Sequence, residues 1–232
     1  MSSARRLAVV GADRTAAALA TGLAGLGHDV GWADGAATAP PRVSGADFVF
    51  VCGAARSVVD RLGSWMPTGS VVVNCCVPPW HDTAELRAAV GRDVPAASHP
   101  LNLRAGRAAP DVAAPDRIVV GAADERTRED VLSLYAGVDA PVLRTGVREA
   151  DVIAAATDAY CVLRQEFFDQ LAGLCAAVGV DVDGVVAGLR PDERIDCDVE
   201  PDVVPPGVAS LLDFAGEQPD PVLLAWRYRG TA

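Results

Sequence analysis

The chain has 232 residues, half of them apolar, and a formal net charge of −11. This length can bury one large core, or one domain with a smaller appendage. The acidic balance argues against nucleic acid or an anionic membrane as a partner, because both attract basic surfaces. All 20 basic residues are arginines, so neither a Schiff-base lysine nor a lysine general base is available.

The cysteine and hydropathy patterns bear on compartment and metal content. The six cysteines form no C-x-x-C pair and there is no histidine cluster, so we expect no metal site. The chain enters a strand almost at once, without a charged-then-apolar signal segment. No apolar run reaches the ~20 residues that span a bilayer. We therefore expect a reduced, cytoplasmic, soluble protein that binds a small molecule and no membrane.

The first part of the chain alternates short apolar runs with helical patterns. Strands are predicted at 5–10, 27–34, 47–52, 70–75, 94–98, 117–121 and 141–144. Helices are predicted at 17–26 and 57–66, from 82 onward, and from 124 to about 135. This βαβ alternation indicates an α/β fold, a Rossmann-like and mostly parallel sheet, over residues 1–146.

The pattern changes at residue 147. From 147 to 178 there is no proline, and apolar residues recur at helical spacing, which predicts one long helix. A shorter helix is predicted from 181, so 147–195 forms a second region. Because a small domain cannot cover so long a helix, we expect this region to form a homodimer. The remaining residues, 196–232, form a proline-rich acidic tail.

The segment Gly11-Ala12-Asp13-Arg14-Thr15-Ala16 joins the first predicted strand to the first helix. It fits the dinucleotide fingerprint G-x-G-x-x-G/A except at Asp13, where the second glycine is expected. Asp34 ends the second strand, where an acid binds the ribose of NAD. The predicted cofactor-binding residues are Gly11, Ala12, Asp13, Arg14, Asp34 and Gly53, for NAD or NADP. A carboxylate at Asp13 would repel the pyrophosphate, whereas Arg14 would offset it or hold a phosphate.

Four segments together resemble the UDP-glucose/GDP-mannose dehydrogenase family. They are N-C-C-V-P at 74–78, S-H-P-L-N-L-R-A-G at 98–106, P-D-R-I-V-V-G at 115–121 and C-A-A-V-G-V-D-V-D at 175–183. They occur in the family's order, and the resemblance covers roughly residues 7–195. It implies a sheet domain that binds NAD and a long helix that dimerises.

The same resemblance implies a lost catalytic set. The family's G-x-C-x-P-K-D segment is absent, and the chain ends where the C-terminal domain would begin; Cys197 is taken as a chance cysteine. The family's threonine corresponds to Cys76, its glutamate to Leu101 and its lysine to Arg164. Leucine is no base, and arginine does not exchange protons near neutral pH. We therefore expect a truncated, divergent member that does not oxidise UDP-glucose.

Polar groups remain at the family's site positions. The candidate catalytic residues are Cys76, His99, Asn102, Arg164 and Asp169. His99 follows a strand end and is the expected proton carrier, with a loop histidine of no consequence as the alternative. Cys76 is a candidate nucleophile or a buried apolar residue, and Arg164 binds an anion or pairs with an acid on its own helix. His81 is a second histidine candidate, or covers a helix N-terminus.

Two functional hypotheses follow. The first is a dimeric NAD(P)-dependent oxidoreductase that performs a single hydride transfer on a small polar substrate. The second is a non-redox descendant of the family, which binds a ligand or partner or catalyses a cofactor-free step in the former substrate cleft. Gly11, Ala16 and Asp34 favour the first hypothesis, whereas Asp13 and the altered catalytic positions favour the second.

Overall fold

The structure, a computed structural model, describes residues 4–76, 80, 82–101, 103–104 and 107–195. Its strands are β1 (Arg6–Val10), β2 (Asp29–Ala33), β3 (Phe48–Val51), β4 (Val71–Asn74), β5 (Ala96–Ser98), β6 (Ile118–Ala122) and β7 (Val142–Thr145). Its α-helices are α1 (Arg14–Gly25), α2 (Ala39–Val43), α3 (Arg56–Trp65), α4 (Thr83–Val90), α5 (Ala108–Ala113), α6 (Glu125–Leu132), α7 (Val147–Val178) and α8 (Val182–Leu189), and a 3-10 turn, η1 (Ser133–Tyr135), follows α6.

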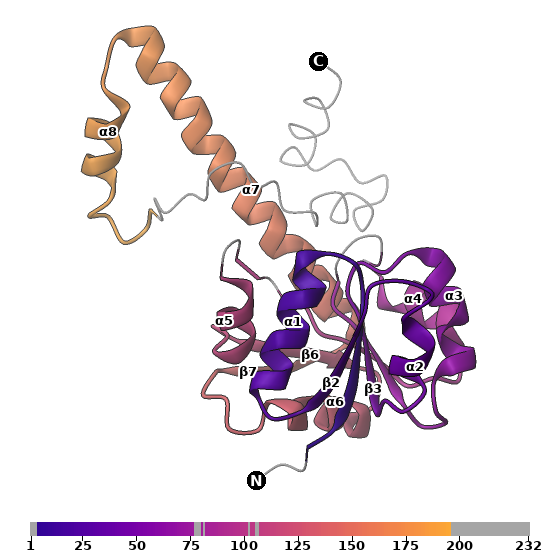
Figure 1. The fold of residues 1–232 in the computed structure, drawn as a ribbon. Helices are drawn as coiled ribbons and strands as arrows, with labels where there is room; N and C mark the ends of the chain where they lie inside the picture. Colours follow the sequence, from indigo (N-terminus) through magenta and orange to yellow (C-terminus); the bar gives the residue numbers. More distant parts are fainter. Residues whose placement is uncertain (1–3, 77–79, 81, 102, 105–106, 196–232) are drawn as a thin grey trace.

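The strands form one sheet in the order β2-β1-β3-β4-β5-β6-β7, with helices on both faces (Figure 1). Every neighbouring pair is parallel except β5 and β6. The strand order reverses between β1 and β3, which is the point where open α/β sheets bind ligands beyond their strand ends. The predicted Rossmann-like fold is therefore confirmed.

The core lies on both faces of the sheet because side chains alternate along each strand. Leu7 and Val9 of β1 pack with α1 and α5, whereas Ala8 and Val10 face the α2–α4 side. All seven predicted strands and the predicted helices are present. The short helices α2 and α5 are additions, and prolines occupy their first turns, where the missing N–H is not needed.

The long predicted helix is present from Val147 to Val178, as expected. Gly179 ends it in the left-handed conformation, with φ 70° and backbone bonds to the last turn. The first turns of α7 pack against β5 and β6. Its far half projects away from the sheet and carries α8 (Figure 1). The predicted tail at 196–232 lies outside the described residues.

Candidate functional site

The turn between β1 and α1 is held tightly against the next strand. A Cβ at Gly11 would lie 1.8 Å from the Cys52 carbonyl oxygen, so only glycine fits there. The Gly11 N–H donates to the Ala33 carbonyl, and the Trp32 indole donates to the Gly11 carbonyl at 2.8 Å. This packing explains the first fingerprint glycine whether or not a cofactor binds.

Asp13 is the N-cap of α1. Its Oδ1 accepts a hydrogen bond from the Ala16 N–H at 2.8 Å, and its backbone is extended, as in an ordinary helix cap. The carboxylate thus uses one of the amide groups that a phosphate would otherwise contact. Ala12 and Arg14 flank it and are exposed, so the guanidinium of Arg14 is free to approach an anionic ligand from solvent.

The other predicted cofactor residues lie at the same edge of the sheet. Asp34 directly follows β2, is exposed, and accepts a hydrogen bond from the Thr38 hydroxyl at 2.8 Å. Gly53 lies beyond β3 in the left-handed conformation, with φ 68°, which favours glycine. Asp34 is exposed and Gly53 is half-buried, and both lie beyond the carboxyl ends of their strands.

Cys76 lies two residues beyond β4 in a strained conformation. Among the described residues it is the only non-glycine with a positive φ, 57°. Its N–H donates to the Asn74 side chain at 3.0 Å. Its sulfur lies 3.3 Å from the Ser98 hydroxyl and 3.5 Å from the Asp151 carboxylate. Strain of this kind persists where surrounding contacts impose it, as they do here.

Asp151, in the first turns of α7, is the centre of these contacts. It is 2% exposed, yet it accepts hydrogen bonds from the Thr83 N–H at 3.0 Å, the Thr83 hydroxyl at 2.6 Å and the Ser98 hydroxyl at 2.6 Å. Asn74 in turn donates to the Thr83 hydroxyl at 3.0 Å. We call Asn74, Cys76, Thr83, Ser98 and Asp151 the Asp151 cluster.

The cluster shifts the proton affinities of its two acidic members. Burial raises the pKa of Asp151, and the hydrogen bonds from Ser98 and Thr83 offset only part of this rise. Burial, followed by the charge of Asp151, raises the pKa of the Cys76 thiol well above its ordinary value. In both groups the shift favours the protonated form.

Sequence reasoning missed Asp151. The predicted stripe of α7 contained apolar residues only, and Asp151 was passed over although Ala150, Ala154 and Ala155 on either side of it are buried. A buried acid on a helix indicates that a polar partner contacts it. Here the partners lie on other elements, so the sequence of α7 does not identify them. β4, α4 and β5 bring the remaining members together at one edge of the sheet.

The structure corrects the expectation for His99. It is 4% exposed, with Nδ1 2.7 Å from the Val119 carbonyl and Nε2 2.7 Å from the Tyr135 hydroxyl. A carbonyl only accepts, so Nδ1 carries the proton and Nε2 accepts from Tyr135. With both nitrogens occupied inside the core, His99 is a structural histidine, and the prediction of an accessible proton carrier is wrong.

Arg164 and Asp169 also differ from expectation. They lie 13 and 18 residues beyond Asp151 on α7, which corresponds to about 20 and 27 Å along the helix. Asp169 accepts a hydrogen bond from the Gln165 side chain on the same helix, at 3.1 Å. Arg164 and Asp169 are therefore too far along α7 to form one site with Cys76 of the same chain. Asn102 and His81 lie outside the described residues.

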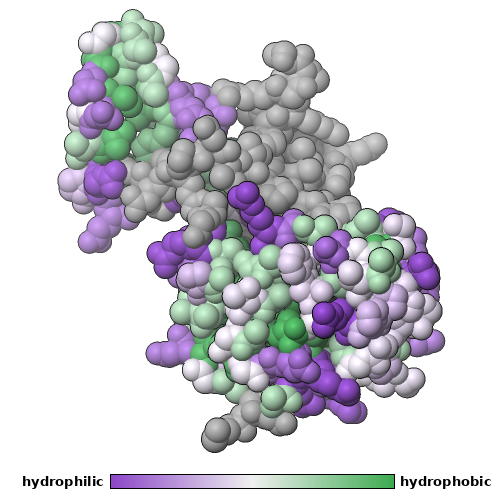
Figure 2. All heavy atoms as spheres, in the orientation of Figure 1, coloured by the Kyte–Doolittle hydropathy of each residue, from purple (hydrophilic) through white to green (hydrophobic). Residues whose placement is uncertain are grey.

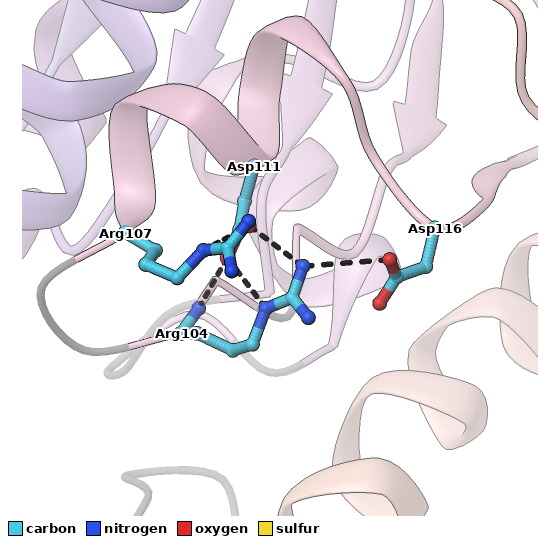
Figure 3. Close-up of polar contacts among 4 residues, drawn as sticks. All are labelled: Arg104, Arg107, Asp111 and Asp116. Carbon is cyan, nitrogen blue, oxygen red and sulfur yellow. Dashed lines mark hydrogen bonds and ion pairs between the residues drawn. The ribbon is translucent and has the colours of Figure 1, made fainter.

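An ion-pair cluster shapes the segment that follows β5. Figure 3 shows Arg104 reaching between Asp111 and Asp116, with Arg107 on the other side of Asp111. The Asp111 carboxylate accepts from the Arg104 N–H, Nε and Nη2 at 3.0, 3.0 and 2.7 Å. Helix α5 packs closely against α1. A Cβ at Gly22 of α1 would lie only 2.4 Å from the Val112 side chain of α5.

Metal binding and membrane insertion are the two remaining properties to consider. Within the described ranges, no group of three or more histidine, cysteine, aspartate or glutamate side chains could hold a metal ion. None of the helices in the described part of the chain is both long enough and apolar enough to cross a bilayer.

Comparisons with known proteins agree with the fold, although no family model matches the chain. Over 152 residues, or 60% of the chain, it is 34% identical to UDP-glucose 6-dehydrogenase of Pseudomonas aeruginosa, covering 33% of that protein. Over 160 residues, or 65% of the chain, it is 32% identical to the Rhizobium meliloti UDP-glucose 6-dehydrogenase, covering 36% of it.

Solved structures extend the similarity. A UDP-glucose dehydrogenase from Pyrobaculum islandicum superposes with a TM-score of 0.70 and 26% identity, over 84% of this chain and 58% of that one. The chain is related to the UDP-glucose/GDP-mannose dehydrogenases. A Mycobacterium tuberculosis 3-hydroxyisobutyrate dehydrogenase shares the fold alone, with a TM-score of 0.65 and 15% identity over 87% of this chain and 75% of that one. The chain spans about a third of the two curated dehydrogenases that it matches.

Proposed function

We propose that the chain is a nicotinamide-dependent oxidoreductase that performs one hydride transfer on a small polar substrate. The observation that carries the proposal is the β1–Gly11–α1 turn at the reversal point of the sheet, in a chain related to dehydrogenases. Open α/β sheets bind dinucleotides at this point. A bound nicotinamide would supply the hydride acceptor or donor.

The residues at the turn fit a dinucleotide in part. Asp34 is exposed beyond β2, where it can bind a ribose hydroxyl, and this favours NAD over NADP. Gly11 and Gly53 keep the edge free of side chains. Asp13 opposes the fit because its carboxylate bonds the Ala16 amide and adds negative charge near the phosphates. We infer that the cofactor binds with a weakened pyrophosphate contact.

The substrate is proposed to differ from UDP-glucose. Leu101 stands where the resemblance implies a glutamate, and it packs against the core. Arg164, at the implied lysine position, cannot exchange protons near neutral pH. A second oxidation to an acid also needs a thiol that holds the aldehyde. One oxidation step needs only a hydride acceptor and a proton acceptor.

Two copies of the chain are proposed to pair through α7. Tyr160, Phe167 and Leu174 recur at every seventh position and are 60%, 55% and 60% exposed. Figure 2 shows apolar surface on the projecting α7–α8 unit. A stripe of this length can supply the ~2,000 Å² that a stable dimer interface buries.

The non-redox alternative is supported by one observation, the Asp13 carboxylate at the N-terminus of α1. In that case the same edge of the sheet would hold a ligand that carries no phosphate at this point.

Titration of the purified protein with NAD(H) and NADP(H), followed by calorimetry, tests the proposal. We expect a Kd below about 1 mM for NAD(H) and weaker binding of NADP(H). Absence of binding at several millimolar would refute the oxidoreductase and favour the alternative. Incubation with UDP-glucose and NAD should produce no NADH.

A further inference from the structure

The Asp151 cluster contains a chain of three groups that differ in burial. Asp151 is 2% exposed and Ser98 is fully buried, whereas Cys76 is half-buried and is the least enclosed member. Ser98 is the last residue of β5, and Cys76 lies just beyond β4, so both are at the edge where α/β sheets bind ligands. The thiol is therefore the member that a ligand at this edge would meet.

The directions of the hydrogen bonds follow from the distances and the available protons. The Ser98 hydroxyl lies 2.6 Å from Asp151 Oδ1, and a carboxylate only accepts, so the single Ser98 proton points to Asp151. The Cys76 thiol also donates to Asp151 Oδ1, at 3.5 Å, and its sulfur lies 3.3 Å from the Ser98 oxygen. The protons of Cys76 and Ser98 are thus both directed at Asp151.

We propose that Cys76, Ser98 and Asp151 form a proton-transfer site, in which the thiol meets a hydroxyl or carbonyl substrate and Asp151 takes up or returns the proton. The substrate class rests on the proposed oxidoreductase. The site replaces His99, whose ring nitrogens are used in the core.

The step balances in protons and electrons. In the oxidation direction, a bound nicotinamide would supply the acceptor for the C–H electron pair as hydride, and the substrate C–O bond would become C=O. The hydroxyl proton would move to the sulfur while the thiol proton moves to Asp151 Oδ1, which also accepts the hydrogen bond from Ser98. Reduction runs the same hops in reverse. Ser98 and Asp151 act through Cys76, so they are positioning and proton-accepting residues rather than contacts of the substrate.

Few other groups compete for the proton. Thr83 from α4 contributes a hydroxyl and an amide to Asp151, and neither titrates near neutral pH. Among titratable groups, Cys76 bonds Asp151 directly, and Asp158 on α7 acts on Cys76 through its charge. Cys76 and Asp151 are therefore two titratable groups in direct contact at this site.

The first experiment measures alkylation of Cys76 by iodoacetamide against pH, with fragment-ion mass spectrometry to separate it from Cys75. The thiolate is the reactive form, so the rate reports the ionisation of the thiol. Asp151→Asn removes the carboxylate charge and should speed alkylation at pH 8 roughly tenfold, as a downward shift of about one pH unit in the midpoint requires. Asp158→Asn makes the same charge change without the hydrogen bond and should give at most about a twofold change.

The second experiment tests the contribution of Ser98. Ser98→Ala should slow Cys76 alkylation severalfold, because the hydroxyl that partly offsets the charge of Asp151 beside the thiol is lost. Ser70→Ala is the matched control, since Ser70 is also a buried serine but donates to the Ala46 carbonyl. Circular dichroism melting checks that each variant is folded, and the Ser98 comparison decides the matter if Asp151→Asn fails to fold.

Equal rates for Asp151→Asn and Asp158→Asn, or for Ser98→Ala and Ser70→Ala, would overturn the proton-transfer site. Titration of the same proteins with NAD(H) separates this outcome from the proposed function. Coupled alkylation without cofactor binding would retain the site and reject the oxidoreductase. Cofactor binding without coupling would do the reverse.

Discussion

The Tyr135 hydroxyl donates a hydrogen bond to His99 Nε2 at 2.7 Å, deep in the core. The two rings also lie against each other, with centroids 5.1 Å apart. Because His99 Nδ1 donates to the Val119 carbonyl at 2.7 Å, the pair joins η1, β6 and the end of β5. His99 thus stabilises the fold. Its position after a strand end had instead predicted a catalytic role.

This pair makes stability depend on pH. Burial lowers the pKa of His99, and the hydrogen bond to Val119 opposes only part of that shift. The unfolded chain therefore gains a proton before the folded one as pH falls. The contribution is complete above about pH 6.5 and is lost as pH falls from there through the lower folded pKa. Urea unfolding from pH 7.5 to 5 should show this decline, and His99→Gln should flatten it; an unchanged slope would contradict the assignment.

Tyr135→Phe removes the donor to His99 and leaves a buried acceptor unsatisfied. We expect a loss of about 1–3 kcal/mol in the free energy of unfolding. Tyr160→Phe is the control, because Tyr160 is 60% exposed on α7 and should be close to neutral. Equal stabilities of the two variants would show that the hydrogen bond contributes nothing.

Asp13 should weaken dinucleotide binding by its charge while stabilising α1 as a cap. Asp13→Asn keeps a capping oxygen and removes the charge, so NAD(H) should bind more tightly with little change in stability. Asp13→Gly should also tighten binding and cost a few tenths of a kcal/mol. Calorimetry and urea unfolding measure the two effects. Unchanged affinity in both variants would place Asp13 outside the phosphate contact.

Asp111 should stabilise the segment after β5 above acidic pH. Burial raises the pKa of its carboxyl, but the hydrogen bonds from Arg104 outweigh this and leave the pKa lowered. The stabilisation is therefore present above about pH 3.8 and is lost as pH falls through the folded value. Asp111→Asn should cost about 1–3 kcal/mol at pH 7 and much less near pH 3. Asp116→Asn, at an exposed partner of Arg104, should cost under 1 kcal/mol.

Phe167→Glu should dissociate the proposed dimer. Phe167 is 55% exposed in the middle of the apolar stripe of α7, and a buried charge there would have no partner. Gln170→Glu, one turn away at a polar position, adds the same charge and should leave the dimer intact. Sedimentation equilibrium at micromolar concentration distinguishes them. A monomeric wild type would refute the dimer itself.

The sequence by itself determined the elements and their order. Continuous apolar runs such as Phe48–Val51 and the uninterrupted helical spacing from Val147 to Val178 are properties of neighbouring residues, so they can be read without the rest of the chain. Asp82 was expected to open a helix, and its side chain does cap α4 through the Ala84 and Glu85 amides. The relation to the dehydrogenases could also be predicted from short motifs, two of which, 74–78 and 98–106, begin at strand ends.

Only the tertiary structure decided what the polar residues do. His99 and Cys76 both follow strand ends, yet β6 and Tyr135 enclose the first, whereas Asp151 and Ser98 bind the second. Asp151 is 75 residues from Cys76 in the chain, and the packing of α7 against β5 brings them together. Arg164 and Asp169 are separated from that site by the rigid rise of the same helix. The periodicity of a sequence indicates on which face of a helix or strand a residue lies. Its contact partner depends on which other element packs against that face.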